Sequence, residues 1–285
     1  MKKTTIIRWV FFGTMVILFL SCQNMRDDNS KVNFPSAISI SEDTLVCPER
    51  AVTMGFITTK TPEDTSWSVE IRKAPRWVSV EKLHPGVYRV LVEAPRKSAG
   101  DYPFSIRLKY GGKTYDKSLL ARVERFKGHA FSLDGPKYWK EAVKQAETGD
   151  MIRLMNGDFG DLVIYKKKTF SLLITRAAGF HPKVHSITIR NSKNIDIFGL
   201  DIHTQASGDS TDALPAIKIA PNSHTIGIHH CLIGPNNGSQ TTGIGSEGNE
   251  MYIYNNFIQN QKTPLQLDGK QNEVHDNLLY PFKKQ

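Results

Sequence analysis

One position of a recurring phrase is occupied by residues with flat rings: Phe198, His229, Tyr254 and His275. If successive phrases form neighbouring parallel strands, these rings stack about 4.8 Å apart on the outward face of a sheet. Such a stripe could bind a sugar chain through contacts between sugar C–H groups and the ring faces. It could equally be an aromatic ladder that stabilises the fold, or be covered by the insertion at residues 203–215. His229, His230 and His275 also raise the question of a metal, but the sequence offers no further ligand to complete a site.

The phrase that carries these rings predicts a solenoid. It reads "IDIFGLDI" (195–202), "IGIHHCLI" (226–233), "MYIYNNFI" (251–258) and "NEVHDNLL" (272–279), and it recurs after 31, 25 and 21 residues. Each copy follows a second short strand, namely "SITIR", "AIKIA", "TGIGS" or "PLQLD". Two apolar columns result: Ile197, Ile228, Ile253 and Val274, and then Ile202, Ile233, Ile258 and Leu279. Periods of this size predict coils of short parallel strands around a continuous apolar core.

Asparagines interrupt the last two phrases at a position where the earlier copies carry Leu200 and Cys231. We place Asn256 and Asn277 at the corner between two sheets, because asparagine tolerates left-handed backbone. Their side chains are predicted to form a two-step ladder that bonds to the bend of each turn. The alternative is that they are ordinary polar loop residues.

The first 22 residues are typical of a secretory signal, with a basic start, a short apolar core and Leu20-Ser21-Cys22. This end resembles the lipobox of bacterial lipoproteins, in which the cysteine is diacylated, so Cys22 is the predicted lipid anchor. Residues 23–32 form a polar tether, and its Arg26-Asp27-Asp28 resembles the export signal of Bacteroidetes-type surface lipoproteins. We therefore expect an outer-membrane, lipid-anchored protein that faces the cell surface, with a periplasm-facing anchor as an alternative. An uncleaved membrane anchor is the alternative.

Residues 33–127 contain about seven short alternating stretches separated by turn residues, which predicts an immunoglobulin-type β-sandwich. Trp67 and Trp77 are expected in its core, although tryptophans could also form a sugar platform. The block is similar to the small sandwich modules, including BACON-like ones, of Bacteroidetes surface lipoproteins. Residues 128–285 form the second domain. It begins with a short amphipathic helix on which Tyr138, Ala142, Val143 and Ala146 share one face and cap the core.

Composition excludes few functions. The formal net charge is +9, and removal of Lys2, Lys3 and Arg8 with the signal segment lowers it to +6. No basic run supports nucleic-acid binding. Cys47 and Cys231 read as small buried residues, and there is no cysteine cluster for a metal.

Two longer stretches resemble a known family. "GDMIRLMNGDFGDLVIYKK" and "SLLITRAAGFHPKVHSITIRNSKNIDIFGLDIH" are similar to the opening of right-handed β-helix polysaccharidases, most of all the chondroitinase B and alginate lyase group. The shared pattern is a helical cap, a strand that ends in Asn/Asp-Gly, an I-x-I pair and N-I-x-I-x-G-L-x-I. It covers about residues 130–280 and implies an all-β chain with a short right-handed parallel β-helix. These phrases encode core and corners, so they imply the fold more than the activity.

The same resemblance implies candidate catalytic residues. Lyases of that group abstract a proton next to a sugar carboxylate with a lysine base, an arginine acid and often Ca²⁺ held by Asn and Glu. Lys218 and Arg190, which are outward residues in neighbouring turns, could take the first two roles, and Glu247 and Glu250 could contact a metal. All four could instead be solvated surface. The chain has four or five turns, fewer than is usual in the group.

Two further observations concern the carboxylates and the C-terminus. Pectin-degrading glycoside hydrolases use paired Asp, but Asp201 and Asp212 lie in different elements, which disfavours that chemistry. The last turn is followed at once by Tyr280, Pro281 and Phe282. Either these fold under the open end as a cap, or another chain covers it and produces a homo-oligomer.

Three functions remain from the sequence. The leading one is a cell-surface lipoprotein that recognises polysaccharide in a glycan-utilisation system. The second is an active polysaccharide lyase on an acidic glycan, with Ca²⁺ as its cofactor. The third is a structural or adhesive surface protein without a sugar ligand.

Overall fold

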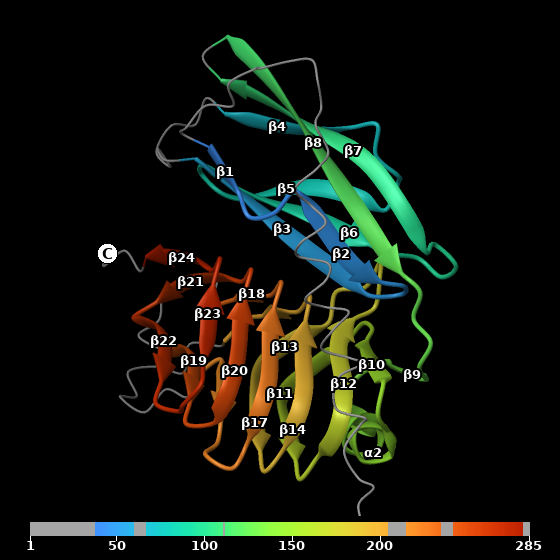
Figure 1. Ribbon diagram of the computed structural model, residues 1–285, viewed down its shortest axis with the longest axis vertical. Coiled ribbons are helices and arrows are strands. Elements are labelled where there is room, and N and C mark those ends of the chain that lie inside the picture. The colour runs from blue at the N-terminus through green and yellow to red at the C-terminus, as the bar shows by residue number, and fades with distance from the viewer. Residues whose placement is uncertain (1–37, 60–66, 111, 205–214, 235–241, 282–285) are drawn as a thin grey trace, which may run out of the picture. The chain divides into compact units, whose positions relative to one another are not determined.

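A computed structural model describes residues 38–59, 67–110, 112–204, 215–234 and 242–281 (Figure 1). Pro35–Gln285 form one compact unit. Its helices within the described ranges are η1 (Pro136–Tyr138) and α2 (Trp139–Gln145). None of the described helices is long and apolar enough to cross a membrane. The signal segment with Cys22 and the tether lie outside the described residues, so they stay predictions.

The described residues of the first block form eight strands in two four-stranded sheets. One sheet has the antiparallel order β1-β3-β6-β5, and the other has the order β2-β8-β7-β4, in which β2 runs parallel to β8. The strands are β1 (Ile38–Ile40), β2 (Thr44–Pro48), β3 (Val52–Thr59), β4 (Ser68–Arg72), β5 (Val78–His84), β6 (Val87–Glu93), β7 (Gly100–Tyr110) and β8 (Lys113–Glu124). The sequence predicts about seven strands. The number differs because the stretch that contains β1 and β2 reads as one strand, whereas its two halves belong to different sheets. The immunoglobulin-type arrangement stays a prediction.

The two tryptophans of this block differ in burial. Trp67 is buried and stacks on Tyr110 at 3.9 Å between ring centroids. Trp77 is half-buried and meets Tyr102 edge-on at 4.9 Å. The expected core position therefore holds for Trp67 and only in part for Trp77, which lies just before β5 begins.

From about residue 130 the chain forms a parallel β-solenoid of about five turns. A seven-stranded sheet has the order β23-β20-β17-β14-β12-β10-β9, and a nine-stranded sheet runs from β22 through β13 to β24, with β11 paired to β13. The strands are β9 (Ala130–Leu133), β10 (Asp150–Leu154), β11 (Asp158–Tyr165), β12 (Lys168–Arg176), β13 (Lys183–Arg190), β14 (Lys193–Phe198), β15 (Asp201–Ile202), β16 (Ile217–Ile219), β17 (His224–His229), β18 (Leu232–Ile233), β19 (Thr242–Ser246), β20 (Asn249–Tyr254), β21 (Phe257–Gln261), β22 (Thr263–Leu267), β23 (Glu273–His275) and β24 (Leu278–Pro281). The parallel solenoid is confirmed, and its right-handed sense stays a prediction.

The predicted apolar columns are confirmed by the strand register. Ile197 pairs with Ile228, Ile228 with Ile253, and Ile253 with Val274. The second column pairs in the same way as far as Leu279. The isoleucines are fully buried, whereas Val274 is 42% exposed and Leu279 is 47% exposed. These two residues belong to the last turn, and no further turn covers them within the described residues.

The short helix α2 packs on the first turns, but with a different residue from the one expected. Ala142, Val143 and Ala146 are buried in the solenoid core, as the periodicity indicates. Tyr138 is 58% exposed, and Trp139 is buried in its place, with its indole Nε1–H donated to the carbonyl of Val163. Tyr138 belongs to the 3₁₀ turn before the helix, so the helical spacing does not extend back to it.

Left-handed residues mark both ends of the strands in the seven-stranded sheet. Near the start of the strands, positive φ angles recur at one register position, with values of 56° to 58°, at Asn194, Thr225, Glu250 and Gln271. After the strands they recur at Gly199, His230, Asn255 and Asp276. The sequence interpretation assigned the left-handed backbone to Asn256, and the structure places it one residue earlier. Asn255 bends the chain, so that Asn256 can point inward.

The asparagines form a hydrogen-bonded pair at this corner. Asn256 is fully buried; its Nδ2 donates to Asn277 Oδ1 at 2.9 Å and to the carbonyl of Ile228 at 2.8 Å. Its Oδ1 accepts from the backbone N–H of Cys231 at 3.0 Å. Asn277 Nδ2 donates in turn to the carbonyl of Ile253. Each amide therefore satisfies backbone groups that the bend removes from the sheet.

An apolar cluster joins the first block to the solenoid. On the side of the first block it contains Val52, Met54, Phe56, Val87 and Leu91, and on the solenoid side Leu232 and Phe257. Tyr280 packs against this cluster and stacks on His84 at 4.6 Å. Tyr280 is therefore not folded under the last turn, which corrects one of the two predicted arrangements for that side chain. Phe282 lies outside the described residues.

The two cysteines of the folded part are free and fully buried. Burial raises the pKa of each thiol, Cys47 and Cys231, to about 12. Both thiols therefore stay protonated and unreactive at neutral pH, as the interpretation of small buried residues implies.

Candidate functional site

The rings of the recurring phrase stack along the seven-stranded sheet. His229 and Tyr254 lie 4.6 Å apart at 14°, and Tyr254 and His275 lie 5.1 Å apart at 7°. Phe198 follows at 4.9 Å from His229, tilted by 47°. Because these rings face one another, the column turns ring edges toward solvent. A sugar that needs an open ring face could find one only beyond His275, at the last turn.

Burial falls along this ring column. Phe198 is 3% exposed, the side chain of His229 is 15% exposed, and that of His275 is 51% exposed. Burial also raises the pKa of the Tyr254 hydroxyl above its usual value, and the charges of Asp196 and Glu42 add to the shift. The inner rings thus contribute packing, and the accessible polar groups are the edges of the outer ones.

A chain of polar contacts begins behind the ring column, in the turn between β1 and β2. Glu42 Oε1 lies 2.8 Å from His230 Nε2, and His230 Nδ1 lies 3.1 Å from His229 Nδ1. His229 Nε2 then faces Asp196 Oδ1 at 4.0 Å. Burial, with repulsion from His230 as a second cause, holds the pKa of His229 well below 6.5. His229 is therefore a neutral ring at neutral pH.

Asp196 ends this chain as an unpaired carboxylate. Its side chain is 43% exposed, and His229 Nε2, at 4.0 Å from Oδ1, is too distant for a direct hydrogen bond. The neighbouring strand carries Gly227 at the paired position, where an added Cβ would lie 2.1 Å from Asp196 Oδ1. Loss of hydration in this notch raises the pKa of Asp196 to about 6. Perturbed carboxylates of this kind are candidates for binding or proton transfer.

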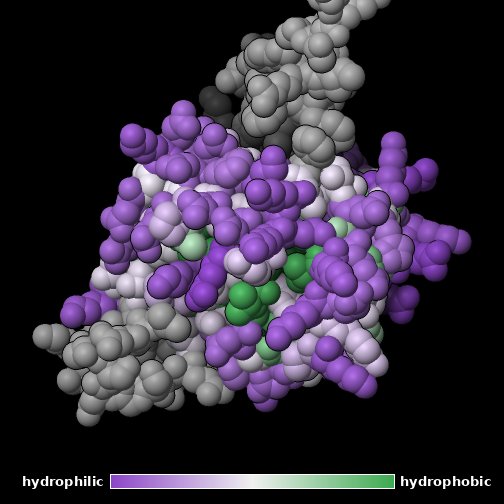
Figure 2. Space-filling view, turned by 90° about the horizontal axis from the view of Figure 1, so that it is seen from below, coloured by the Kyte–Doolittle hydropathy of each residue, from purple (hydrophilic) through white to green (hydrophobic). Residues whose placement is uncertain are grey.

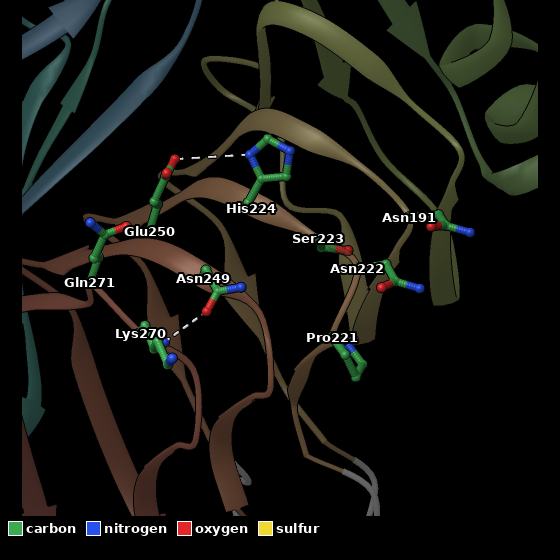
Figure 3. A pocket seen from close by; sticks show the side chains of 9 residues that line it. All are labelled: Asn191, Pro221, Asn222, Ser223, His224, Asn249, Glu250, Lys270 and Gln271. Atoms are coloured by element: carbon green, nitrogen blue, oxygen red, sulfur yellow. Dashed lines mark hydrogen bonds and ion pairs between the residues drawn. The ribbon is translucent and has the colours of Figure 1, made fainter.

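A second feature is a shallow, open groove where the strands of the seven-stranded sheet begin (Figure 3). Its volume is about 870 Å³, and it is lined by Asn191, Pro221, Asn222, Ser223, His224, Asn249, Glu250, Lys270 and Gln271. We call these residues the corner groove. It spans the entries to β17, β20 and β23, at the lower side of the solenoid in Figure 1, and the view from below in Figure 2 shows a mostly hydrophilic surface.

Some groups of the corner groove are held in place and others are open. Thr225 Oγ1 donates to Glu250 Oε2 at 2.6 Å, and Glu250 lies 3.9 Å from His224 Nδ1. The backbone N–H of Lys270 donates to Asn249 Oδ1 at 2.8 Å. The side-chain amides of Asn222 and Gln271 make no hydrogen bond to any described residue. The groove thus offers donors, acceptors and both charges along neighbouring turns.

The residues implied by the lyase resemblance lie in the nine-stranded sheet. Arg190 ends β13 and is exposed, and Lys218 lies in β16, paired with Thr188. They are diagonal neighbours on adjacent strands, so their Cα atoms are roughly 7–8 Å apart. The outward row through Lys218 continues with Gly245 and Gln266, and neither is an acidic or basic group. Nothing in this row assigns proton-transfer roles to Lys218 and Arg190, and these roles stay predictions.

The expected metal contacts are not brought together. Glu247 is exposed in the turn after β19, and Glu250 is engaged by Thr225. Among the described residues no group of three or more His, Cys, Asp or Glu side chains could hold a metal ion. His229, His230 and His275 are occupied by stacking and by hydrogen bonds, as described above. A metal contact by Glu247 or Glu250 stays a prediction.

Asp201 is held by ion pairs with two arginines. Arg89 Nη1 lies 2.5 Å from Asp201 Oδ1, and Arg176 Nη1 lies 3.4 Å from Asp201 Oδ2. Burial alone would raise the pKa of Asp201, but the two arginines lower it below its usual value. Arg89 also pairs with Glu81, and Arg176 approaches Glu93 at 3.8 Å. We call these five residues the ion cluster. Asp212, the other carboxylate considered, lies outside the described residues.

Sequence reasoning missed Asp196 and Glu42. Asp196 falls between two core isoleucines of β14, which gives only an outward position. The available signal was Gly227 at the same position one turn later, which leaves room for a neighbouring side chain. Glu42 is 188 residues from His230 in sequence, and no local pattern joins them.

Comparisons with known proteins find weak structural similarity. No protein-family profile matches the sequence, and no curated protein matches it. Weak structural similarity is found to an endo-fucoidan hydrolase from glycoside hydrolase family 107, with 12% identity over 34% of this chain and 17% of that one and a TM-score of 0.27. A Bacteroides fragilis protein provisionally described as an alpha-galactosidase gives 12% identity over 52% of this chain and 37% of that one, with a TM-score of 0.24. The matched regions are thus well under half of each known structure.

Proposed function

We propose that this chain is a non-catalytic, glycan-binding lipoprotein of a bacterial outer membrane. The observation that carries the proposal is the corner groove, an open polar surface that continues over several solenoid turns. A polysaccharide is a repeating array of hydroxyl groups, and amide and carboxylate side chains at successive turns recognise such an array by hydrogen bonds. The turns repeat at about 4.8 Å, so neighbouring side chains can engage neighbouring sugars.

Openness favours binding over chemistry in this groove. Catalysis of glycosyl or uronate chemistry needs groups whose charge is held in a water-excluded position. Apart from the buried Ser223, the groups of the corner groove are exposed or half-exposed, and its His224 and Glu250 are joined through Thr225. Shallow, hydrated surfaces bind long polymers through many weak contacts instead of one deep pocket.

The cellular setting is part of the proposal. The lipobox-like Cys22 and the Arg26-Asp27-Asp28 segment of the tether support attachment to the outer membrane, with the exposed face of that membrane as the preferred side. The first block, as an immunoglobulin-type module, would then serve as a spacer between the anchor and the solenoid. A glycan-utilisation system is the context in which such a protein would deliver its ligand for import.

A glycan array tests the proposal directly. The chain from residue 23 onward, which contains all described residues, is presented with neutral and acidic polysaccharides, with and without Ca²⁺. Binding and the absorbance of unsaturated products are both recorded. We expect binding without product release, and at least a tenfold loss of affinity in Asn222→Ala/Gln271→Ala.

Two variants distinguish the remaining hypotheses. Lys218→Ala, in β16 and not among the residues that line the groove, should leave affinity unchanged. Product release that Lys218→Ala abolishes would make the protein a lyase and overturn the proposal. An absence of binding across the array would instead support a structural or adhesive role. Affinity that is lost on Tyr254→Ala but kept in the groove variant would move the binding surface to the ring column.

A further inference from the structure

We propose that Arg50 and Arg153 together bind an oxyanion, a sulfate, phosphate or carboxylate group that is free or part of a larger ligand. The two arginines belong to different blocks and meet where the turn between β2 and β3 lies against the seven-stranded sheet. This site is separate from the corner groove and does not rest on it.

Arg153 lies on the outward face of β10, in the row that continues as the ring column. Its register partners are Ser132 in β9 and Thr175 in β12, and Thr175 in turn pairs with Phe198. Arg153 is half-buried, and its Nη2 donates a hydrogen bond to Ser132 Oγ. Its Nε–H is buried and makes no hydrogen bond to any described residue. Arg153 therefore keeps a buried donor that a ligand can use.

The turn between β2 and β3 brings Arg50 to the same part of the sheet. Val52 follows Arg50 by two residues, and its carbonyl lies against Gly199. A Cβ added to Gly199 would be 1.9 Å from the Val52 oxygen and 3.5 Å from Thr175 Oγ1. Thr175 is the residue next to Arg153 in its row. Arg50 is half-buried, and its guanidinium forms no ion pair with a described residue.

No described acid compensates the charge of Arg153. Its pKa is lowered from the ordinary arginine value to about 10, with loss of hydration as the larger cause and repulsion by Arg50 as the second. Arg107 shows the opposite case, because its hydrogen bond to Asp116 raises its pKa. At neutral pH both Arg50 and Arg153 are charged, since a guanidinium stays protonated well above pH 7. The pair is therefore a site of uncompensated positive charge.

The two guanidinium groups determine the chemistry of the ligand. A guanidinium carries only donors, so the ligand must supply acceptors. Water could accept from the Arg153 Nε–H, but the repulsion between the two charges would remain, whereas an anion offsets it. A guanidinium fork binds two oxygen atoms at once, which favours an oxyanion over a monoatomic ion such as chloride. Ser132 is exposed beside Arg153, so the oxyanion can also be carried by a larger molecule.

The folded chain is prepared for this ligand before it arrives. Arg153 has already lost part of its hydration, so an anion that binds it causes less further desolvation than it would at a fully hydrated arginine. The hydrogen bond to Ser132 and the position of Arg153 in the sheet limit the rotation of its side chain. A binding group that is already oriented loses little entropy when the ligand binds.

Calorimetry at pH 7 tests the site with simple salts. The chain from residue 23 onward, in a buffer without oxyanions, is titrated with sodium sulfate, sodium phosphate and sodium acetate, and with sodium chloride at equal ionic strength. We expect saturable binding of sulfate that is at least tenfold tighter than that of chloride. Equal affinities for sulfate and chloride, or no binding of any of these oxyanions, would overturn the proposal.

Matched substitutions locate the bound anion. Arg153→Gln and Arg50→Gln should each lower the affinity for sulfate at least tenfold. Arg107→Gln is the control, because Arg107 is already bonded to Asp116 at 2.7 Å, and it should change the affinity less than twofold. An equal loss in all of these variants would indicate a general effect of charge and contradict the assignment.

A charge reversal tests the contact between the two arginines without any ligand. Arg50→Glu replaces repulsion of Arg153 with attraction, so we expect the Tm to rise by about 2 °C in a buffer without oxyanions. The further rise that sulfate produces in the unsubstituted protein should disappear. Glutamate suits this test because Arg50 has a φ of 71°, and a left-handed backbone strains both side chains similarly. A lower Tm of Arg50→Glu would contradict the contact, and this readout holds even if Arg153→Gln does not fold.

The Nε–H of Arg153 reports on the bound anion directly. In ¹H–¹⁵N correlation spectra its resonance should shift, and its exchange with water should slow, as sulfate is added. An Arg153 Nε–H signal that is unchanged at saturating sulfate would contradict the role of this donor.

A sulfated sugar identifies the source of the oxyanion. N-acetylglucosamine 6-sulfate is compared with free sulfate and with unsulfated N-acetylglucosamine. Binding of the sulfated sugar as tight as that of sulfate would support a group carried by a larger molecule, and binding of sulfate alone would support a free anion. Asn222→Ala/Gln271→Ala in the corner groove should leave the affinity for sulfate unchanged, so this site and the proposed function fail independently.

Discussion

The ion cluster and the Glu42–His230–His229–Asp196 chain both join the first block to the solenoid through polar groups. In the ion cluster each charge meets an opposite charge, and its central members Arg89, Arg176 and Asp201 are largely buried. The histidine chain starts at an equally paired contact but ends at a carboxylate that is half open and unpaired. A group of charges in which every member is paired stabilises the contact between two parts of a protein. A group that ends in an unpaired carboxylate leaves that carboxylate able to bind a cation.

The largest loss of stability is expected when one member of the ion cluster is removed. Asp201→Asn leaves Arg89 and Arg176 without their shared partner, and removal of one member of a buried ion pair costs about 3–5 kcal/mol. We expect the free energy of unfolding in urea to fall by about 3 kcal/mol. Glu81→Gln is the matched control, because the Glu81 side chain is 42% exposed and should matter by less than about 1 kcal/mol. Equal losses of stability for the two substitutions would mean that Asp201 is not the shared partner of the buried arginines.

The pKa of Asp201 adds a pH dependence to this comparison. Its folded-state pKa lies below its usual value, so its contribution to stability is present above about pH 4 and is lost as the pH falls through the folded value. The unsubstituted protein should lose stability between about pH 4 and pH 2 more steeply than Asp201→Asn. Parallel stability curves in this range would contradict the pairing.

Asn256→Ala should have the next largest effect, and it acts on the corner that carries the histidine chain. The substitution removes the acceptor of the Cys231 N–H and the donor to the Ile228 carbonyl, both buried. Buried polar groups left unsatisfied cost about 1–3 kcal/mol, and we expect about 2 kcal/mol by thermal unfolding. Asn277→Ala, at the half-exposed last turn, should cost about half as much, and a reversed order would argue against the corner ladder.

Asp196→Asn should change stability in the opposite direction. The folded-state pKa of Asp196 is raised to about 6, so its ionisation destabilises the folded chain as the pH rises from about 4 through 6. The amide removes this penalty. Since 43% of the side chain is exposed, we expect a gain of only about 1 kcal/mol at pH 7 and none at pH 3.5. A loss of stability at pH 7 would show that Asp196 has a partner after all.

The smallest effect is expected at the outer end of the ring column. His275→Ala removes a half-exposed ring that stacks on one face of Tyr254. We expect a loss of no more than about 0.5 kcal/mol in unfolding free energy. His229→Ala, at an inner position stacked on Tyr254 and bonded to His230, should cost several times more. Equal losses would mean that the column contributes uniformly along its length.

The sequence predicts the repeating part of this fold well, because each turn repeats one physical requirement. Alternating isoleucines at a period of 21 to 31 residues fixed both the strand register and the apolar core, as the pairing of Ile228 with Ile253 shows. The same logic placed the rings in one column. It could not say that they would face one another, because that depends on side-chain rotation.

The unpaired carboxylate of Asp196 could not be predicted from the sequence, for a different reason. Asp196 matters because of Gly227 one turn later, His229 beside it and Glu42 in a different block. Such a site depends on four residues brought together by tertiary structure, and none of them forms a motif. The displaced helix start at Trp139 and the bend at Asn255 are smaller errors of the same origin, since backbone geometry at element ends varies by a residue or two.

The apolar cluster between the two blocks also sets an order of events during synthesis. Leu91 leaves the ribosome 166 residues before Phe257, which packs in the same cluster. At about 5–20 residues per second, the apolar side of the first block waits roughly 10–30 s for its partner. During that interval Val52, Phe56 and Leu91 of the nascent chain form an exposed apolar surface. This surface is a binding site for chaperones until the last solenoid turns have been synthesised.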